Sequence, residues 1–112
     1  MWDVLNILRD CEYLNENFEN DHYDANKEEI QQSRYEYMYF RNLADHIEIM
    51  LKSNKYSIEE MKEKSIEYFN KMYAEFEKSS AKSIKEKKKA TMLKEQAFYS
   101  VYNVLEDALS QI

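Results

Sequence analysis

Apolar side chains recur at intervals of three and four residues along most of the chain, which is the period of an amphipathic α-helix. The clearest example lies between residues 27 and 52, where one seam consists of Ile30, Ser33, Tyr37, Phe40, Ala44, Ile47 and Leu51. A second row beside it contains Gln32, Tyr35, Tyr39, Leu43, His46 and Met50. At about 100° per residue, the two rows span roughly 200° of the helix surface. We therefore expect this helix to contact two neighbouring helices, or one helix and a binding partner.

Interruptions of this pattern divide the chain into segments. Residues 20–26 and 53–57 contain Asn, Asp and Ser side chains, which bond to the local backbone and favour turns over helix. Ser57 and Glu60 also have the spacing of a capping box, in which each side chain accepts a hydrogen bond from the other residue's backbone N–H. A weaker break at residues 78–83 is accompanied by Ser83 and Glu86 at the same spacing.

These breaks predict four helices, at about residues 2–20, 27–52, 58–78 and 84–111. If the weaker break is absent, the last two segments form one continuous helix and the chain is a long helical hairpin. The apolar face of the first helix is expected to contain Val4, Leu5, Leu8, Cys11, Leu14 and Phe18. The predicted core positions on the other seams are Phe40, Ile47, Phe69, Phe98 and Val101.

The composition supports the helical prediction, because the 112 residues include no glycine and no proline. Hairpin-rich β folds depend on glycine for positive φ angles in their turns. We therefore predict one all-α domain over residues 1–112, a small antiparallel bundle. The longest apolar run is only a few residues, too short to span a bilayer, and Asp3 and Asp10 stand where a signal peptide is basic. These features predict a cytoplasmic protein, or one exported without a cleavable signal.

Charge is distributed unevenly between the two halves. Residues 1–53 hold five Lys and Arg against twelve Asp and Glu (net −7), while residues 54–112 hold eleven against ten (net +1). Carboxylates cluster between residues 10 and 29. Such an acidic surface is either a plain solvated face, or a mimic of a nucleic-acid backbone that occupies a basic groove on a partner.

A run of lysines is the other unusual charge feature. Residues 78–94 hold seven lysines and one glutamate, and the candidate basic patch within them consists of Lys82, Lys85, Lys87, Lys88 and Lys89. A solvated helix face is one interpretation, and contact with nucleic acid or another anionic surface is the alternative. The run contains no arginine, which argues against bidentate recognition of bases or phosphates.

Motifs for catalysis and metal binding are weak. Glu19 and His22 have the Glu-x-x-His spacing of di-iron bundles, but those sites need the motif twice, and Leu43 stands three positions before His46. The sequence also lacks a phosphate-binding loop, a glycine-rich turn and a Ser/His/Asp arrangement. We predict no metal, no cofactor and no enzymatic activity.

Ten tyrosines are an unusually large number for a domain of this size. Tyrosine is enriched at interfaces because its ring buries a large area at low entropic cost while its hydroxyl tolerates water. The outer row of the helix at 27–52, with the neighbouring acids, is therefore the predicted contact surface. The predicted partner-binding residues are Tyr35, Tyr39, His46, Glu16, Glu19, Asp21 and Asp24.

The sequence thus predicts a non-catalytic protein–protein interaction module, a small acidic inhibitor or regulator that binds and occludes another protein or a second copy of itself. In size and acidity it is similar to small inhibitors encoded by phages or mobile elements and to toxin-immunity proteins. One alternative is a helical hairpin that dimerises or escorts a partner, similar to those of specialised secretion systems but without their Trp-x-Gly turn. A further alternative is binding of nucleic acid through the lysine run.

Overall fold

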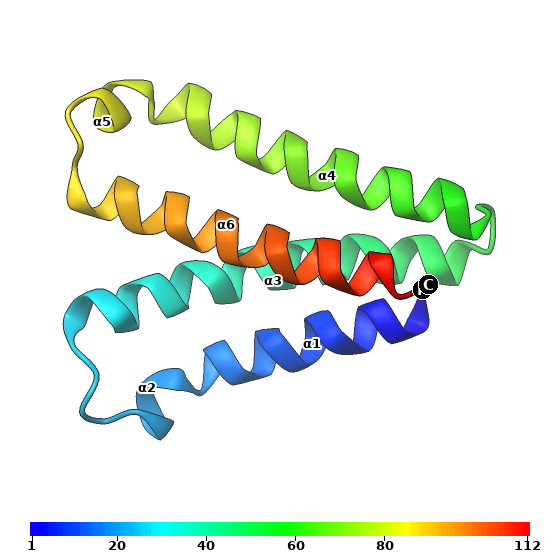
Figure 1. Cartoon of the computed structure of the whole chain (residues 1–112), viewed down its shortest axis with the longest axis horizontal. Coiled ribbons are helices and arrows are strands. Elements are labelled where there is room, and N and C mark those ends of the chain that lie inside the picture. Colours follow the sequence, from blue (N-terminus) through cyan, green and yellow to red (C-terminus); the bar gives the residue numbers. More distant parts are fainter.

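The structure, a computed structural model, describes all residues 1–112 and is built only of helices (Figure 1). In chain order these are α1 (Trp2–Glu16), α2 (Phe18–Asp21), α3 (Lys27–Ser53), α4 (Ile58–Ser79), α5 (Ala81–Lys85) and α6 (Lys89–Ser110). The four long helices lie side by side, and the short helices α2 and α5 lie at the same end of the molecule. The all-α prediction is confirmed.

The number and ends of the helices differ from the prediction. The first helix ends at Glu16 instead of residue 20. Its C-cap is Asn17, a turn-favouring residue whose side-chain amide bonds to the backbone by donating to the Tyr13 carbonyl oxygen at 2.9 Å. A separate helix, α2, follows. The last helix begins at Lys89, since Ser83 lies inside α5 and caps nothing. The continuous helix over residues 58–111 is also wrong, because the chain reverses direction between α4 and α6 (Figure 1).

The turn between α5 and α6 depends on a left-handed residue. Lys87 has φ 53°, and its N–H donates to the Ile84 carbonyl while the Lys88 N–H donates to the Ser83 carbonyl. This pair of bonds is the Schellman arrangement, in which the left-handed position is usually glycine. A chain without glycine must place a residue with a Cβ atom there.

The start of α4 agrees with the predicted capping box. The Glu60 N–H donates to Ser57 Oγ at 3.2 Å, and the Ser57 N–H donates to Glu60 Oε1 at 3.3 Å. At the start of α3, the Glu29 N–H donates to Asn26 Oδ1 at 2.9 Å. Both helices therefore begin where polar side chains satisfy backbone donors that have no partner inside the helix.

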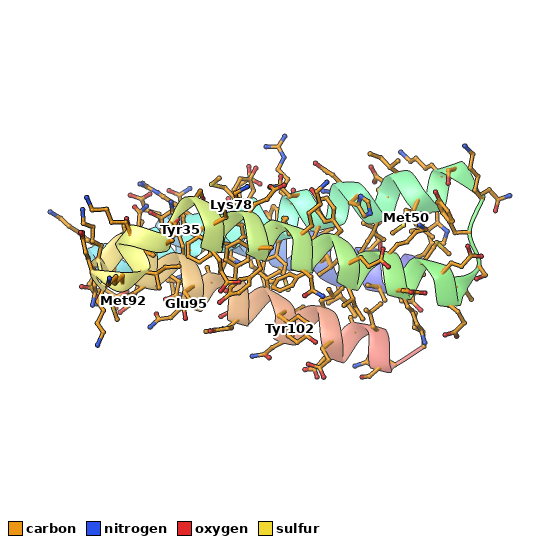
Figure 2. The ribbon with its side chains drawn as sticks, turned by 90° about the horizontal axis from the view of Figure 1, so that it is seen from above. Tyr35, Met50, Lys78, Met92, Glu95 and Tyr102 are labelled. Atoms are coloured by element: carbon orange, nitrogen blue, oxygen red, sulfur yellow. The ribbon has the colours of Figure 1, made fainter.

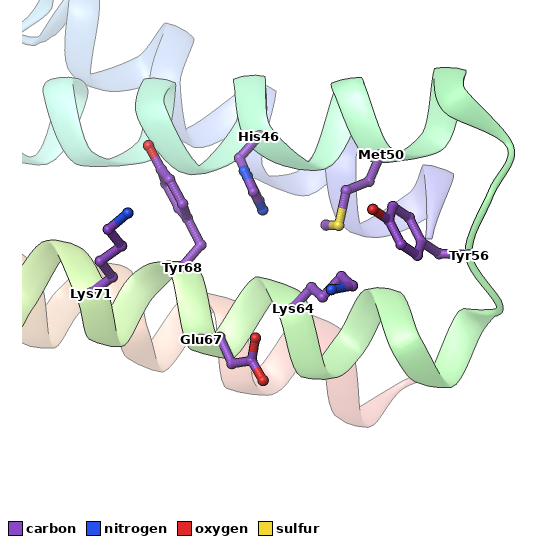
Figure 3. Close-up of a pocket in the computed structure, with 7 residues that line it drawn as sticks. All are labelled: His46, Met50, Tyr56, Lys64, Glu67, Tyr68 and Lys71. Atoms are coloured by element: carbon purple, nitrogen blue, oxygen red, sulfur yellow. The ribbon is translucent and has the colours of Figure 1, made fainter.

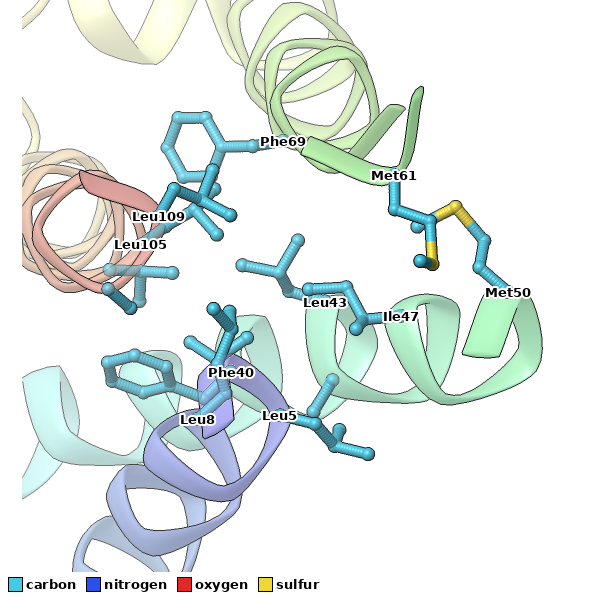
Figure 4. Packing of buried hydrophobic residues seen from close by; sticks show 14 of the residues in the cluster. Leu5, Leu8, Phe40, Leu43, Ile47, Met50, Met61, Phe69, Leu105 and Leu109 are labelled. Atoms are coloured by element: carbon cyan, nitrogen blue, oxygen red, sulfur yellow. The ribbon is translucent and has the colours of Figure 1, made fainter. Parts of the chain in front are cut away.

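Helix α3 lies at the centre of the molecule and contacts α1, α4 and α6. The five predicted core residues are all buried, each at most 5% exposed. Figure 4 shows Leu8 of α1, Phe40 and Leu43 of α3, and Leu105 of α6 packed against one another. Three helices of the same chain therefore cover the wide apolar arc of α3, and a binding partner is not needed to explain it.

The predicted face of the first helix is only partly correct. Val4, Leu5 and Leu8 are buried, whereas Leu14 is 62% exposed. The reason is that α1 ends two residues after Leu14, where the chain departs from the bundle towards α2. Leu14 therefore has no helix on its outer side.

Large rings hold α4 away from the rest of the bundle. The buried alanines Ala44, Ala97 and Ala108 allow α1, α3 and α6 to approach closely. Between α4 and α6, by contrast, the Phe98 ring meets the rings of Phe69 and Phe76, with centroids 5.9 and 5.2 Å apart. The backbones of α4 and α6 come close at only a few positions, and a groove follows each side of α4.

Candidate protein-binding surfaces

Four of the predicted binding residues gather around α2 and the loop that follows it. Glu16, Glu19, Asp21 and Asp24 are all exposed, and we call this surface the acidic tip. Figure 1 shows α2 and its loop projecting at one end of the bundle. The tip also exposes Tyr23, whose side chain is 93% exposed.

Few contacts neutralise the acidic tip. Glu19 forms an ion pair with Arg34 at 2.9 Å, with both side chains about 60% exposed, while the other three carboxylates have no ion pair. Tyr13 and Leu14, in the last turns of α1, add exposed apolar area next to the tip. The surface therefore combines unpaired negative charge with apolar contact area.

His22 is explained by the local structure of the tip. Its ring stacks on Phe18, the first residue of α2, with the centroids 4.2 Å apart, and its Nδ1 lies 3.1 Å from the Phe18 carbonyl oxygen. The Glu-x-x-His spacing found in the sequence thus lies on a four-residue helix and in the cap that ends it.

The other three predicted residues, Tyr35, Tyr39 and His46, lie along α3 where α4 and α6 half cover them. The Lys94 Nζ of α6 is 5.3 Å from the centre of the Tyr35 ring, and Tyr39 stacks on Phe98 of α6 at 3.8 Å. His46 stacks on Tyr68 of α4 at 4.1 Å (Figure 3). Their part in partner binding stays a prediction.

The structure therefore divides the predicted set into two surfaces. The acidic tip is attached to α1 and meets α3 through Arg34, which lies about 100° around the helix from Tyr35. The tyrosine row faces α4 and α6 instead. The sequence did not separate these surfaces because the apolar arc of α3 does not show which neighbour covers which part of it.

A hollow of about 270 Å³ lies between α3 and α4 (Figure 3). Its lining residues are His46, Met50, Tyr56, Lys64, Glu67, Tyr68 and Lys71. Burial, with a contribution from the Lys64 charge, lowers the pKa of His46, so its imidazole is neutral at pH 7. Burial also raises the pKa of Tyr39 to about 12. Tyr39 and His46 are thus uncharged aromatic groups at pH 7.

The predicted basic patch lies at the same end of the molecule as the acidic tip, on α5 and at the start of α6 (Figure 1). Its five lysines are exposed. Two of them are paired within the chain, Lys89 with Glu28 at 3.2 Å and Lys88 with Glu86 at 3.5 Å. Lys82, Lys85 and Lys87 form no ion pair. Sequence reasoning did not foresee that acidic and basic segments about 60 residues apart in the chain would lie together.

A groove between α4 and α6 was missing from the predicted set. It contains a hollow of about 210 Å³ lined by Phe69, Asn70, Tyr73, Tyr99 and Tyr102. Tyr99 is 53% exposed and donates to Glu95 Oε1 at 3.0 Å. The sequence did contain a signal, because Phe69 and Tyr73 are four residues apart and Tyr99 and Tyr102 three, so each pair shares one helix face.

No helix of the structure has the length and apolar character needed to cross a membrane. No protein-family model, curated protein or solved structure matches the chain.

Proposed function

We propose that this protein is a non-catalytic binding module, an acidic regulator or inhibitor that uses its acidic tip to occlude a basic surface on a partner protein. The observation that carries the proposal is the exposure of Tyr23, at 93%, between the unpaired carboxylates of Asp21 and Asp24. Exposure of a largely apolar ring to water is unfavourable, and its burial by a partner would contribute favourable free energy to binding.

The charge and the ring have different roles in this proposal. Carboxylates at the rim of an interface mainly steer association and raise the on-rate. A tyrosine that becomes desolvated at the centre of an interface is a common hot spot, and its truncation to alanine costs about 2 kcal/mol or more. We therefore assign Tyr23 as the anchor, and Glu16, Glu19, Asp21 and Asp24 as the steering charges.

The remaining predicted residues have less support. Tyr35, Tyr39 and His46 each have a ring or ammonium partner within the chain, so a partner protein would gain less by covering them. Binding of nucleic acid through the basic patch is also less well supported, because two of its five lysines are paired internally and the chain is acidic overall.

The test begins with capture of the binding partner from the native host, followed by measurement of Kd for purified variants. Tyr23→Ala should weaken binding at least tenfold, and the quadruple change Glu16→Gln, Glu19→Gln, Asp21→Asn and Asp24→Asn should slow association and reduce its dependence on salt. The matched control changes four other exposed acids to amides, namely Glu67, Glu75, Glu77 and Asp107. Equal effects of the two quadruple changes, or a larger effect of Tyr39→Ala than of Tyr23→Ala, would contradict the assignment.

A further inference from the structure

The groove between α4 and α6 is longer than the single aromatic hollow. A second hollow, of about 450 Å³, lies between α5 and the start of α6 and is lined by Ile84, Lys87, Met92, Glu95, Gln96 and Tyr99. Tyr99 lines both hollows. Met92 and Tyr102 follow the same side of α6, as Figure 2 shows. The groove is therefore continuous, with a half-exposed tyrosine near its middle.

The two ends of this groove carry opposite unpaired charges. At the α5 end, Lys82, Lys85 and Lys87 are exposed and form no ion pair. At the other end, α4 begins beside the end of α6, where Lys62 Nζ lies 2.7 Å from the Ile112 carbonyl oxygen. Glu63 and Glu106 are exposed there, also without an ion pair.

Helical spacing places these carboxylates on the groove. Glu106 follows Tyr99 by seven residues, which is nearly two full turns, so both lie on the same face of α6. On α4, Ile66 is 37% exposed and lies seven residues before Tyr73, so the two share one side of the helix. Glu63 lies three residues before Ile66 and is exposed on the same side. The groove thus runs from a basic end, across a middle where Glu95 and Gln96 accompany the apolar groups of Met92 and Tyr99, to an acidic end.

We infer that this groove is occupied by the same groove of a second copy of the chain, in an antiparallel dimer with a two-fold axis near Gln96 and Tyr99. A two-fold axis pairs each surface with itself in the opposite direction, so the basic end of one copy meets the acidic end of the other. Lys87 then lies against Glu106 of the second copy, and Lys82 and Lys85 lie against its Glu63. The two Tyr99 rings meet close to the axis.

The face is close to the size that a standard dimer interface needs. Its length is that of α6, which has 22 residues, or about 33 Å at about 1.5 Å per residue, and its width is that of two adjacent helices, about 20 Å. A standard interface buries about 800 Å² on each partner. The inference does not rest on the proposed function, because the acidic tip belongs to α1 and α2, which do not line the groove.

The test is sedimentation velocity on the purified full-length chain between about 1 and 300 µM. The parent should shift from monomer to dimer, and Tyr99→Ala should weaken the dimer at least tenfold, while Ile49→Ala, at an exposed apolar residue of α3 outside the groove, leaves it unchanged. Lys87→Glu and Glu106→Lys should each weaken it at least tenfold, because each creates two like-charge contacts. These charge changes lie on exposed side chains, and circular dichroism melting verifies that every variant is folded.

The most specific test of the charge pairing is to mix the Lys87→Glu and Glu106→Lys variants. Each variant alone should be monomeric, whereas the equimolar mixture should form a heterodimer, because opposite charges then face each other at both contact sites. The double variant with both changes should also recover self-association to within about threefold of the parent. A parent that remains monomeric at all concentrations, or a dimer that tolerates both single-charge variants, would overturn the inference. Neither result bears on the acidic tip, which is tested by partner binding.

Discussion

The left-handed conformation of Lys87 allows a direct test of the backbone of this glycine-free chain. Lys87→Gly removes the Cβ atom from a residue with φ 53°. A left-handed residue with a Cβ atom costs about 1–2 kcal/mol, while glycine loses about 0.5–1 kcal/mol more conformational entropy on folding than other residues. The substitution should therefore stabilise the protein by about 0.5–1 kcal/mol, or raise Tm by about 2–4 °C for a domain of this size.

Lys88→Gly is the matched control for this prediction. Lys88 is the next residue in the same turn and is likewise an exposed lysine, but its φ of −65° and ψ of 138° are unstrained. Glycine there relieves no left-handed strain, and because Lys88 is the N-cap residue of α6, a position that accepts glycine, stability should stay within about 0.5 kcal/mol of the parent. Urea unfolding of both variants, followed by circular dichroism at two protein concentrations, separates stability from association. If Lys87→Gly is no more stable than Lys88→Gly, Lys87 does not hold the strain assigned to it.

Three further predictions concern the bundle itself. Phe40→Ala, at a residue 2% exposed in the core, should cost about 3–5 kcal/mol in urea unfolding, and a Tm within 3 °C of the parent would contradict the packing. Ser57→Ala should cost about 0.5–2 kcal/mol, and no loss would argue against the capping box. The lowered pKa of His46 means that the unfolded chain binds the proton more tightly. Stability relative to His46→Gln should therefore fall as the pH drops below about 6.5, and a flat difference between pH 7 and 5 would refute this.

Local signals in the sequence predicted the fold class and most of the core. The heptad-like seam predicted Phe40 and Ile47 as core residues, and the spacing of Ser57 and Glu60 predicted the start of α4, because both depend on contacts within a few residues. The same spacing at Ser83 and Glu86 gave a wrong helix start. There the tertiary contacts that return α6 to the bundle determine where the chain turns, and they are not encoded by a four-residue motif.

The candidate surfaces were predicted less completely for a related reason. The acids of the tip could be listed from the sequence because charged side chains are exposed in most folds. Whether Tyr39 or Tyr99 is free for a partner depends on how far α4 stands from α3 and α6, which is a property of ring packing across three helices. For the same reason the groove between α4 and α6 became recognisable only from the structure.

The central claim, that the acidic tip contacts a partner protein, is tested most directly by site-specific photocrosslinking in the native host. A photoreactive phenylalanine analogue replaces Tyr23 in one variant and Ile49, which is 69% exposed on α3, in another. We predict a discrete crosslinked protein from position 23, formed more slowly when Asp21 and Asp24 are changed to asparagine, and none from position 49. No adduct from position 23, or the same adduct from both positions, would contradict the claim.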